Sequence, residues 1–248
     1  MFLAYPAPFH KGIAASLKSV VTNKPLLIIM AVSLLANFAF QLKVAVNAYY
    51  GEYTLGRVGY VTWLSGMLLL GMLIGSALVP LLLKKFGPKN AAIITLGLGV
   101  VVSLGYWACG YSNVTIVLVW SALCAVVIGS FSVLVNVLTA DAMDYAKLKK
   151  GERNEAIITS TRNFITKLAT AIAGALVGYL LGPIGYAKSQ TQSVYVNDVF
   201  HRLMSIYPSA IYLAAFIVML FYPLSKNTFE SMELELRQKR QKTPNHDP

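Results

Sequence analysis

The sequence predicts an all-α membrane protein with six transmembrane helices, and three observations support this prediction. First, 56% of the 248 residues are hydrophobic and only 12% are charged, whereas soluble domains carry roughly a quarter of charged residues. Second, apolar runs long enough to cross a bilayer recur along the chain. Third, most Lys and Arg residues fall between these runs and gather on one side of them.

Each predicted helix corresponds to an apolar run of about 20 residues or more, the length that crosses the hydrocarbon core. The runs cover residues 26–49, 58–83, 91–109, 114–140, 156–181 and 206–224. They divide the chain into an N-terminal segment (1–25), which is a candidate for a short interfacial helix, a six-helix bundle (26–225) and a basic tail (226–248).

The distribution of cations predicts the orientation. Fifteen Lys and Arg residues lie on one side of the predicted helices, three lie on the other side (Arg57, Lys188 and Arg202), and three lie within helices. The positive-inside rule then places both termini in the cytoplasm of a multi-pass plasma membrane protein. The net charge of +11 does not indicate nucleic-acid binding, because the cations do not form one face interleaved with aromatic residues.

Lys167 is the most informative residue for function, because an ionisable group deep in a bilayer is costly without water or a partner. It lies twelve residues after Glu155, about 18 Å along a helix. Asn163 and Thr170 share its helix face at three- and four-residue spacing. This pattern predicts a face that looks into a polar cavity; a salt bridge within the bundle is the alternative for Lys167.

Three further polar residues fall in predicted helices. Arg162 is close enough to the cytoplasmic end to reach the interface with its stem buried, which favours a structural role. Lys43 lies toward the outer end of the first run, where a partly exposed cavity position and a snorkelling anchor are equally favoured. Asn37, in the same run, adds a candidate polar lining.

The predicted loop after the fourth helix carries closely spaced opposite charges, among them Asp141, Asp144, Arg153 and Glu155. Ionic contacts that form and break at modest cost suit a cytoplasmic gate. An ordinary solvated loop is the alternative explanation of this charge pattern.

No enzymatic motif is found. The sequence has no HExxH, Walker lysine loop or GxSxG pattern, and its three histidines, His10, His201 and His246, fall outside the predicted helices. The two cysteines are expected to pack rather than to bind metal. We therefore expect no catalytic residue, no cofactor and no metal site.

Gly71 with Gly75, and Gly174 with Gly178, have the spacing that permits close helix contact.

One segment carries a longer pattern: Asp-x-x-Asp-Tyr, then Lys-x-Gly-x-Arg-x-Glu, then Ser, an aromatic residue and Lys. It is present as Asp141, Asp144, Tyr145, Lys149, Gly151, Arg153, Glu155, Ser160, Phe164 and Lys167. In this pattern the chain resembles the glycoside–pentoside–hexuronide:cation symporter family, the melibiose-permease-like branch of the major facilitator superfamily. Asn23 to Pro25, the Tyr49–Tyr50 pair and Gly185–Tyr186 extend the resemblance over nearly the whole chain. Lys150 departs from the family, which usually has Thr there.

The resemblance implies a half of a larger fold. Such transporters have two six-helix halves that rock on each other around a central substrate, and this chain would be the C-terminal half. The substrate would be a sugar or glycoside, and the coupling cation Na⁺ or H⁺. No Asp or Glu falls inside a predicted helix, so the cation site is expected mainly in a complementary N-terminal half. By the same resemblance Lys167 would lie near the substrate, and Asp141, Asp144 and Arg153 would form the cytoplasmic lock.

Two alternatives remain at this point: a half-size protein that transports as a homodimer, and a non-transporting membrane scaffold or truncated fragment that binds a partner through its Gly-rich faces.

Overall fold

The computed structural model describes residues 23–150, 155–186 and 192–223. The elements are α2 (Lys24–Tyr49), the π-helical turn η1 (Tyr50–Thr54), α3 (Gly59–Ala108), α4 (Val114–Lys150), α5 (Glu155–Leu181), α6 (Val194–Met204) and α7 (Ile206–Leu220). No strand occurs in these ranges. Several predictions fall on residues outside these ranges. They concern the N-terminal segment, the basic tail, Leu224 at the end of the sixth predicted helix, Lys188 and Arg153.

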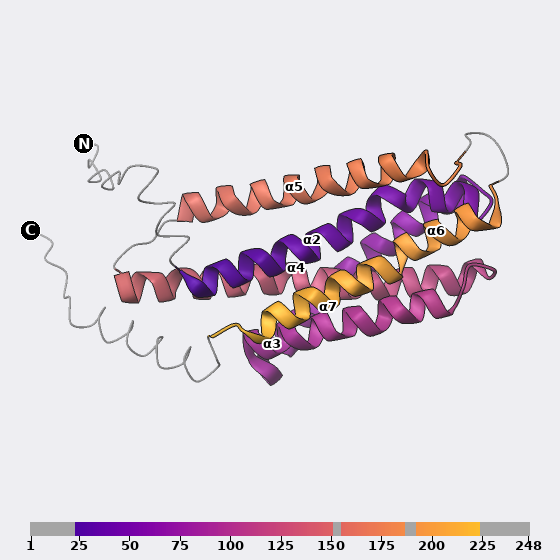
Figure 1. The fold of residues 1–248 in the computed structure, drawn as a ribbon. Helices are drawn as coiled ribbons and strands as arrows, with labels where there is room; N and C mark the ends of the chain where they lie inside the picture. The colour runs from indigo at the N-terminus through magenta and orange to yellow at the C-terminus, as the bar shows by residue number, and fades with distance from the viewer. Residues whose placement is uncertain (1–22, 151–154, 187–191, 224–248) are drawn as a thin grey trace, which may run out of the picture.

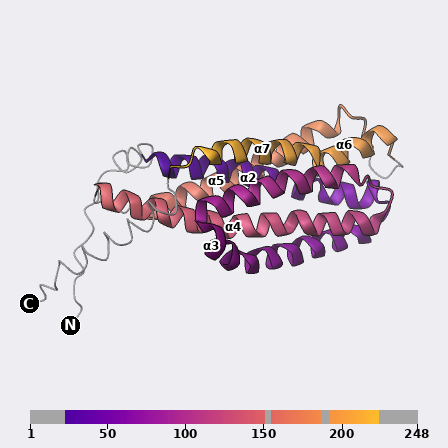
Figure 2. The same ribbon diagram turned by 90° about the horizontal axis from the view of Figure 1, so that it is seen from below.

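The helix α3 crosses the membrane twice. Its 50 residues would extend about 75 Å if straight, more than twice the hydrocarbon thickness of about 30 Å. Gly87 interrupts it with φ 74° and ψ 169°, a conformation open essentially to glycine alone, and Pro88 follows without a backbone N–H. The chain therefore turns back at this point, and the two arms run alongside α4, as Figure 2 shows. They correspond to the predicted helices 58–83 and 91–109.

The last membrane pass is longer than predicted. A candidate span runs over Val194–Leu220 and contains α6 and α7, whereas the expected helix begins at residue 206. The two helices are separated at Ser205 (φ −130°, ψ −74°). Pro208 accounts for the break, because it has no N–H to bond the carbonyl of Met204 four residues earlier. His201 and Arg202 consequently lie within this pass, and the expectation that they fall outside it is wrong.

Helices also extend past other predicted ends. The fourth helix continues to Lys150, so Asp141 and Asp144 are helical rather than part of a loop. Together with Glu52 and Asp198, they lie inside candidate spans, which corrects the expectation that no acid does. All four lie near span ends, where water and lipid headgroups are within reach.

Glycines bring the first arm of α3 against α4. A Cβ at Gly75 would overlap the backbone of Val126, and one at Gly129 would overlap the backbone of Met72. The Ser130 hydroxyl uses this proximity to donate a 2.9 Å hydrogen bond to the Gly75 carbonyl. The close contact predicted at Gly71 and Gly75 is confirmed; in contrast, no atom of another element of the described chain lies within 4 Å of a Cβ at Gly178.

Contacts between segments far apart in sequence close both ends of the bundle. At one end, Asn23 caps α2 by accepting from the N–H of Leu26 at 3.3 Å, and its side-chain amide donates to the carbonyl of Ala142 in α4. At the other end, Thr54 donates to Asn197 of α6 at 3.1 Å. Helix α5 lies along α2 at one side of the bundle (Figure 1). A pocket lies between α5, α2 and α4.

Candidate functional site

A pocket of about 270 Å³ lies between α2, α4 and α5, close to the lower limit of about 300 Å³ for small-molecule sites. Its lining consists of Ser33, Ala36, Asn37 and Phe40 from α2, Met72 from α3, Ile128, Phe131, Ser132 and Val135 from α4, Arg162, Ile165 and Thr166 from α5, and Tyr212 from α7. Most of the wall is apolar or aromatic. A few polar groups converge on it, as in small-ligand sites generally.

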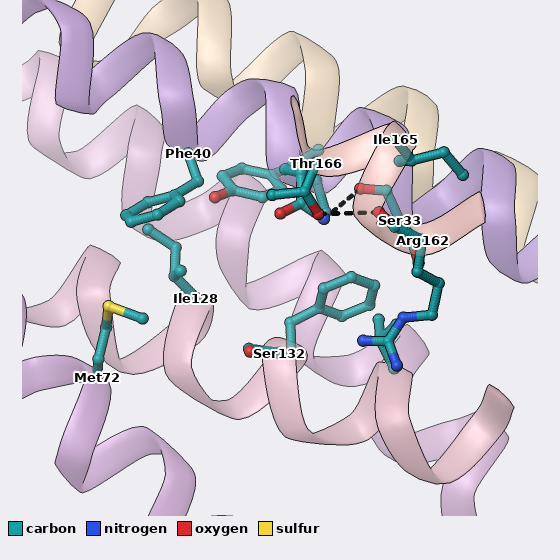
Figure 3. Close-up of a pocket in the computed structure, with 13 residues that line it drawn as sticks. Ser33, Phe40, Met72, Ile128, Ser132, Arg162, Ile165 and Thr166 are labelled. Carbon is teal, nitrogen blue, oxygen red and sulfur yellow. Dashed lines mark hydrogen bonds between the residues drawn. The ribbon is translucent and has the colours of Figure 1, made fainter. Parts of the chain in front are cut away.

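Four of the polar residues that line the pocket form two pairs, and the members of each pair lie one helical turn apart in α2 or α5. Asn37 donates to the carbonyl of Ser33 at 2.8 Å, and Thr166 donates to the carbonyl of Arg162 at 3.1 Å. These local bonds fix the two side chains against their own helices. The Arg162 side chain extends from α5 toward the helix that carries Ser132 (Figure 3). It is the single charged residue of the lining.

Two hydroxyls at the pocket have no hydrogen-bond partner among the described residues. They belong to Ser33 and Tyr212, which are each 3% exposed. A buried hydroxyl without a partner costs about 1–3 kcal/mol. Both hydroxyl oxygens are almost fully enclosed by the described chain.

The predicted residues of α5 lie beside this pocket rather than in it. Asn163, Lys167 and Thr170 are exposed in the described chain, and none of them lines the pocket. Thr170 accepts a hydrogen bond from Gln41 of α2, which ties the middle of α5 to α2. Asn37 does line the pocket. Nothing in these placements tests the predicted role of Lys167, which stays a prediction.

Lys43 is placed differently from either expectation. Its side chain is 4% exposed, and its Nζ has no hydrogen-bond partner among the described residues. The Nζ lies 5.5 Å from the ring centroid of Tyr106. A separate small cavity, lined by α2, α3, α4 and Met204 of α6, contains both residues. Lys43 is therefore buried rather than partly exposed in the described chain, and its predicted role as a substrate-cavity residue stays a prediction.

His201 connects three elements at the end opposite Asn23. Its Nδ1 lies 2.8 Å from the hydroxyl of Tyr50, and its Nε2 lies 3.1 Å from the carbonyl of Trp107. A carbonyl only accepts, so Nε2 carries a hydrogen, and in the neutral ring Tyr50 donates to Nδ1. Beside it, Tyr111 donates to Asp198 at 2.9 Å; burial, followed by this bond, raises the pKa of the Tyr111 phenol.

The proposed charge lock is only partly described. Asp141 is 7% exposed near the end of α4, and Asp144 is half-buried one turn later. Arg153 lies outside the described residues, and of Glu155 only the helical backbone is described. The gate therefore stays a prediction.

Sequence reasoning missed the contribution of Arg162 to the pocket. Depth along the helix indicated an interfacial anchor, but the direction of the side chain depends on which face of α5 packs against α2. The four-residue spacing of Arg162 and Thr166 was the available signal, because it places both on one helix face.

Comparison with known proteins identifies the family. The family described as "MFS/sugar transport protein" matches residues 9–226. The chain is 31% identical over 94% of its length to "Uncharacterized symporter YjmB" of Bacillus subtilis, of which it covers 51%. It is 30% identical over 96% of its length to "Putative sulfoquinovose importer" of Escherichia coli, also 51% covered.

A third relative is "Glucuronide carrier protein homolog" of Escherichia coli, 29% identical over 89% of the chain, with 49% of the relative covered. The chain thus spans about half the length of these relatives. The names of the relatives describe transporters and not enzymes. The match over residues 9–226 shows that the chain belongs to the MFS/sugar transport family.

Proposed function

We propose that the chain is the C-terminal half of a secondary active transporter for sugars or glycosides, coupled to Na⁺ or H⁺. The complementary N-terminal half would be supplied by the same polypeptide or by a second one. Substrate would bind between the halves and reach each side of the membrane in turn. In this arrangement both termini of the bundle and its cation-rich loops face the cytoplasm of a plasma membrane.

The observation that carries this proposal is the pocket between α2, α4 and α5. Its wall combines aromatic faces, such as Phe40 and Phe131, with the polar side chains of Asn37, Ser132 and Thr166. A sugar needs both kinds of group, because its ring faces are apolar and its hydroxyls require hydrogen bonds in a site that excludes water. The relatives named for a sulfoquinovose importer and a glucuronide carrier support a sugar-type solute.

Two observations favour a second half over a scaffold role. The chain covers about half of each of these relatives, and α5 presents polar or charged side chains, Asn163 and Lys167 among them, that are exposed in the described chain. Polar groups at membrane depth need protein or water beside them. A complementary half facing α5 across a hydrated cavity would provide this environment.

Filling the pocket tests the proposal. Ser132 lines the pocket and is exposed, so Ser132→Trp should occupy the solute space and reduce uptake at least tenfold without preventing insertion. Val119, on the same helix and 54% exposed, provides a matched control, and Val119→Trp should leave uptake unchanged. Uptake of labelled sugars is measured per molecule of protein in the membrane, with the N-terminal half present. Equal uptake by both variants would refute a substrate site here.

A further inference from the structure

The first arm of α3, which ends before Gly87, has two contrasting faces. One face is buried at Gly71, Gly75 and Val79, and its glycines lie against α4. The second face is exposed in the described chain and consists of large aliphatic side chains. Each of them is 40% exposed or more: Leu70, Leu73, Ile74, Leu78 and Leu81. Close helix contacts in membranes favour small residues, so the second face suits acyl chains better than another helix.

Two lysines continue this aliphatic face at the end of the arm. Lys84 and Lys85 follow Leu81 by three and four residues, which places them beside it on one side of the helix. Both lysines are exposed in the described chain, and the helix is interrupted immediately afterwards at Gly87. An aliphatic face that ends in two cations matches the two parts of a phospholipid, its acyl chains and its anionic phosphate.

The charges of these two lysines are not used within the described chain. Neither lysine forms an ion pair with an acidic residue of the described ranges. The Nζ of Lys85 lies 5.2 Å from the ring centroid of the neighbouring Phe86, a contact with the face of the ring that uses none of the three N–H donors in a hydrogen bond. Lys89, in contrast, is partly buried and donates to the carbonyl of Tyr222 after α7. Lys89 therefore stabilises the bundle, whereas the charges of Lys84 and Lys85 can meet an external anion.

We propose that this face of α3 binds an anionic phospholipid, whose acyl chains lie along Leu78 and Leu81 and whose phosphate lies between Lys84 and Lys85. An ammonium binds phosphate as a compact point charge, and lysines near a membrane surface attract anionic lipids. A zwitterionic lipid offers the same chains, but its own cationic group opposes the lysines. The face should therefore prefer anionic lipid, whether or not the proposed transport function is correct.

A fluorescent reporter at residue 81 measures this preference locally. Leu81→Cys is labelled with bimane in a chain whose two native cysteines are replaced by alanine, and the chain is reconstituted with an N-terminal half into lipid nanodiscs. Either phosphatidylglycerol or phosphatidylcholine carries bromine on its acyl chains, because bromine quenches a fluorophore that it touches. We expect phosphatidylglycerol to bind here about thirtyfold more strongly than phosphatidylcholine, since each lysine near an anionic surface contributes about fivefold.

The variants assign this preference to the two lysines. Lys84→Gln combined with Lys85→Gln should bring the ratio of the two affinities close to one. Arg57→Gln combined with Arg202→Gln removes the same amount of charge from two other exposed residues and should keep the full ratio. A second reporter at Val101, which is 65% exposed in the other arm of α3, should show no preference between the lipids.

Three results would overturn the inference. The first is equal quenching by the two lipids at residue 81, or a preference that the lysine variant leaves unchanged. The second is a preference that disappears in excess glycerol 3-phosphate, which would assign the lysines to free phosphate rather than to lipid. The third is no quenching by either lipid, which would show that protein covers this face, as the second half or another copy of the chain would. None of these results decides the transport function.

Discussion

At the residue scale, the described chain contains a buried cation that its own helices enclose. The Nζ of Lys43 has no hydrogen-bond partner among the described residues, and the side chain is 4% exposed. The face of Tyr106 at 5.5 Å offers a cation–π interaction of about 2 kcal/mol at best. Removing an ammonium from water costs several kcal/mol. The desolvation cost therefore exceeds the attraction, and we expect Lys43 to lower stability.

We expect Lys43→Met to raise the thermal unfolding temperature in detergent, corresponding to about 1–3 kcal/mol for one unsatisfied buried group. Methionine keeps the length of the side chain and fills the same space. Lys167→Met is the control, because Lys167 is exposed in the described chain and its replacement should not change the unfolding temperature. A lower unfolding temperature for Lys43→Met would show that the ammonium is stabilised by a partner or an ordered water.

The residue scale is also where prediction from sequence was weakest. Hydropathy located Lys43 and Arg162 along their helices, but the direction of each side chain depends on which helices surround it. Asn197, Asp198, His201 and Arg202 lowered the apolarity of residues 194–204, so this segment was not recognised as part of a membrane pass. Asn197, Asp198 and His201 are hydrogen-bonded to groups far away in sequence, namely Thr54, Tyr111, Tyr50 and the Trp107 carbonyl.

At the scale of elements, the sequence predicted more of the structure. Long apolar runs located at least part of each candidate span in the described chain, because lipid imposes a minimum length on each one. The small-residue spacing of Gly71 and Gly75 predicted a close helix contact correctly. The predicted ends of the helices were less accurate. The fourth helix, for example, continues through polar residues to Lys150, where hydropathy no longer indicates a membrane pass.

The contact between α3 and α4 can be tested by one substitution. Because a Cβ at Gly75 would overlap the Val126 backbone, Gly75→Leu should separate the helices and lower the free energy of unfolding by about 1–3 kcal/mol. Gly178→Leu should not, since no atom of another element of the described chain lies within 4 Å of a Cβ there. Unfolding midpoints in detergent measure the difference. Equal midpoints for the two variants would contradict the close contact.

At the scale of the whole molecule, α5 lies at one side of the bundle in the described chain (Figure 1). The helix packs on α2, and its opposite face carries exposed residues such as Phe164 and Lys167. The chain also spans about half the length of its relatives. Together these features support a cavity that a second six-helix half completes.

Uptake of labelled sugars by cells that express the chain alone, or with the N-terminal half of a relative such as YjmB, tests this account most directly. Co-purification confirms that the two halves associate, and membrane abundance normalises the rates. We predict that uptake requires both halves, because alternating access needs two bundles that move relative to each other. Full uptake by the chain alone, or no uptake of any sugar by two halves that associate, would contradict the proposal that this chain is one half of a sugar transporter.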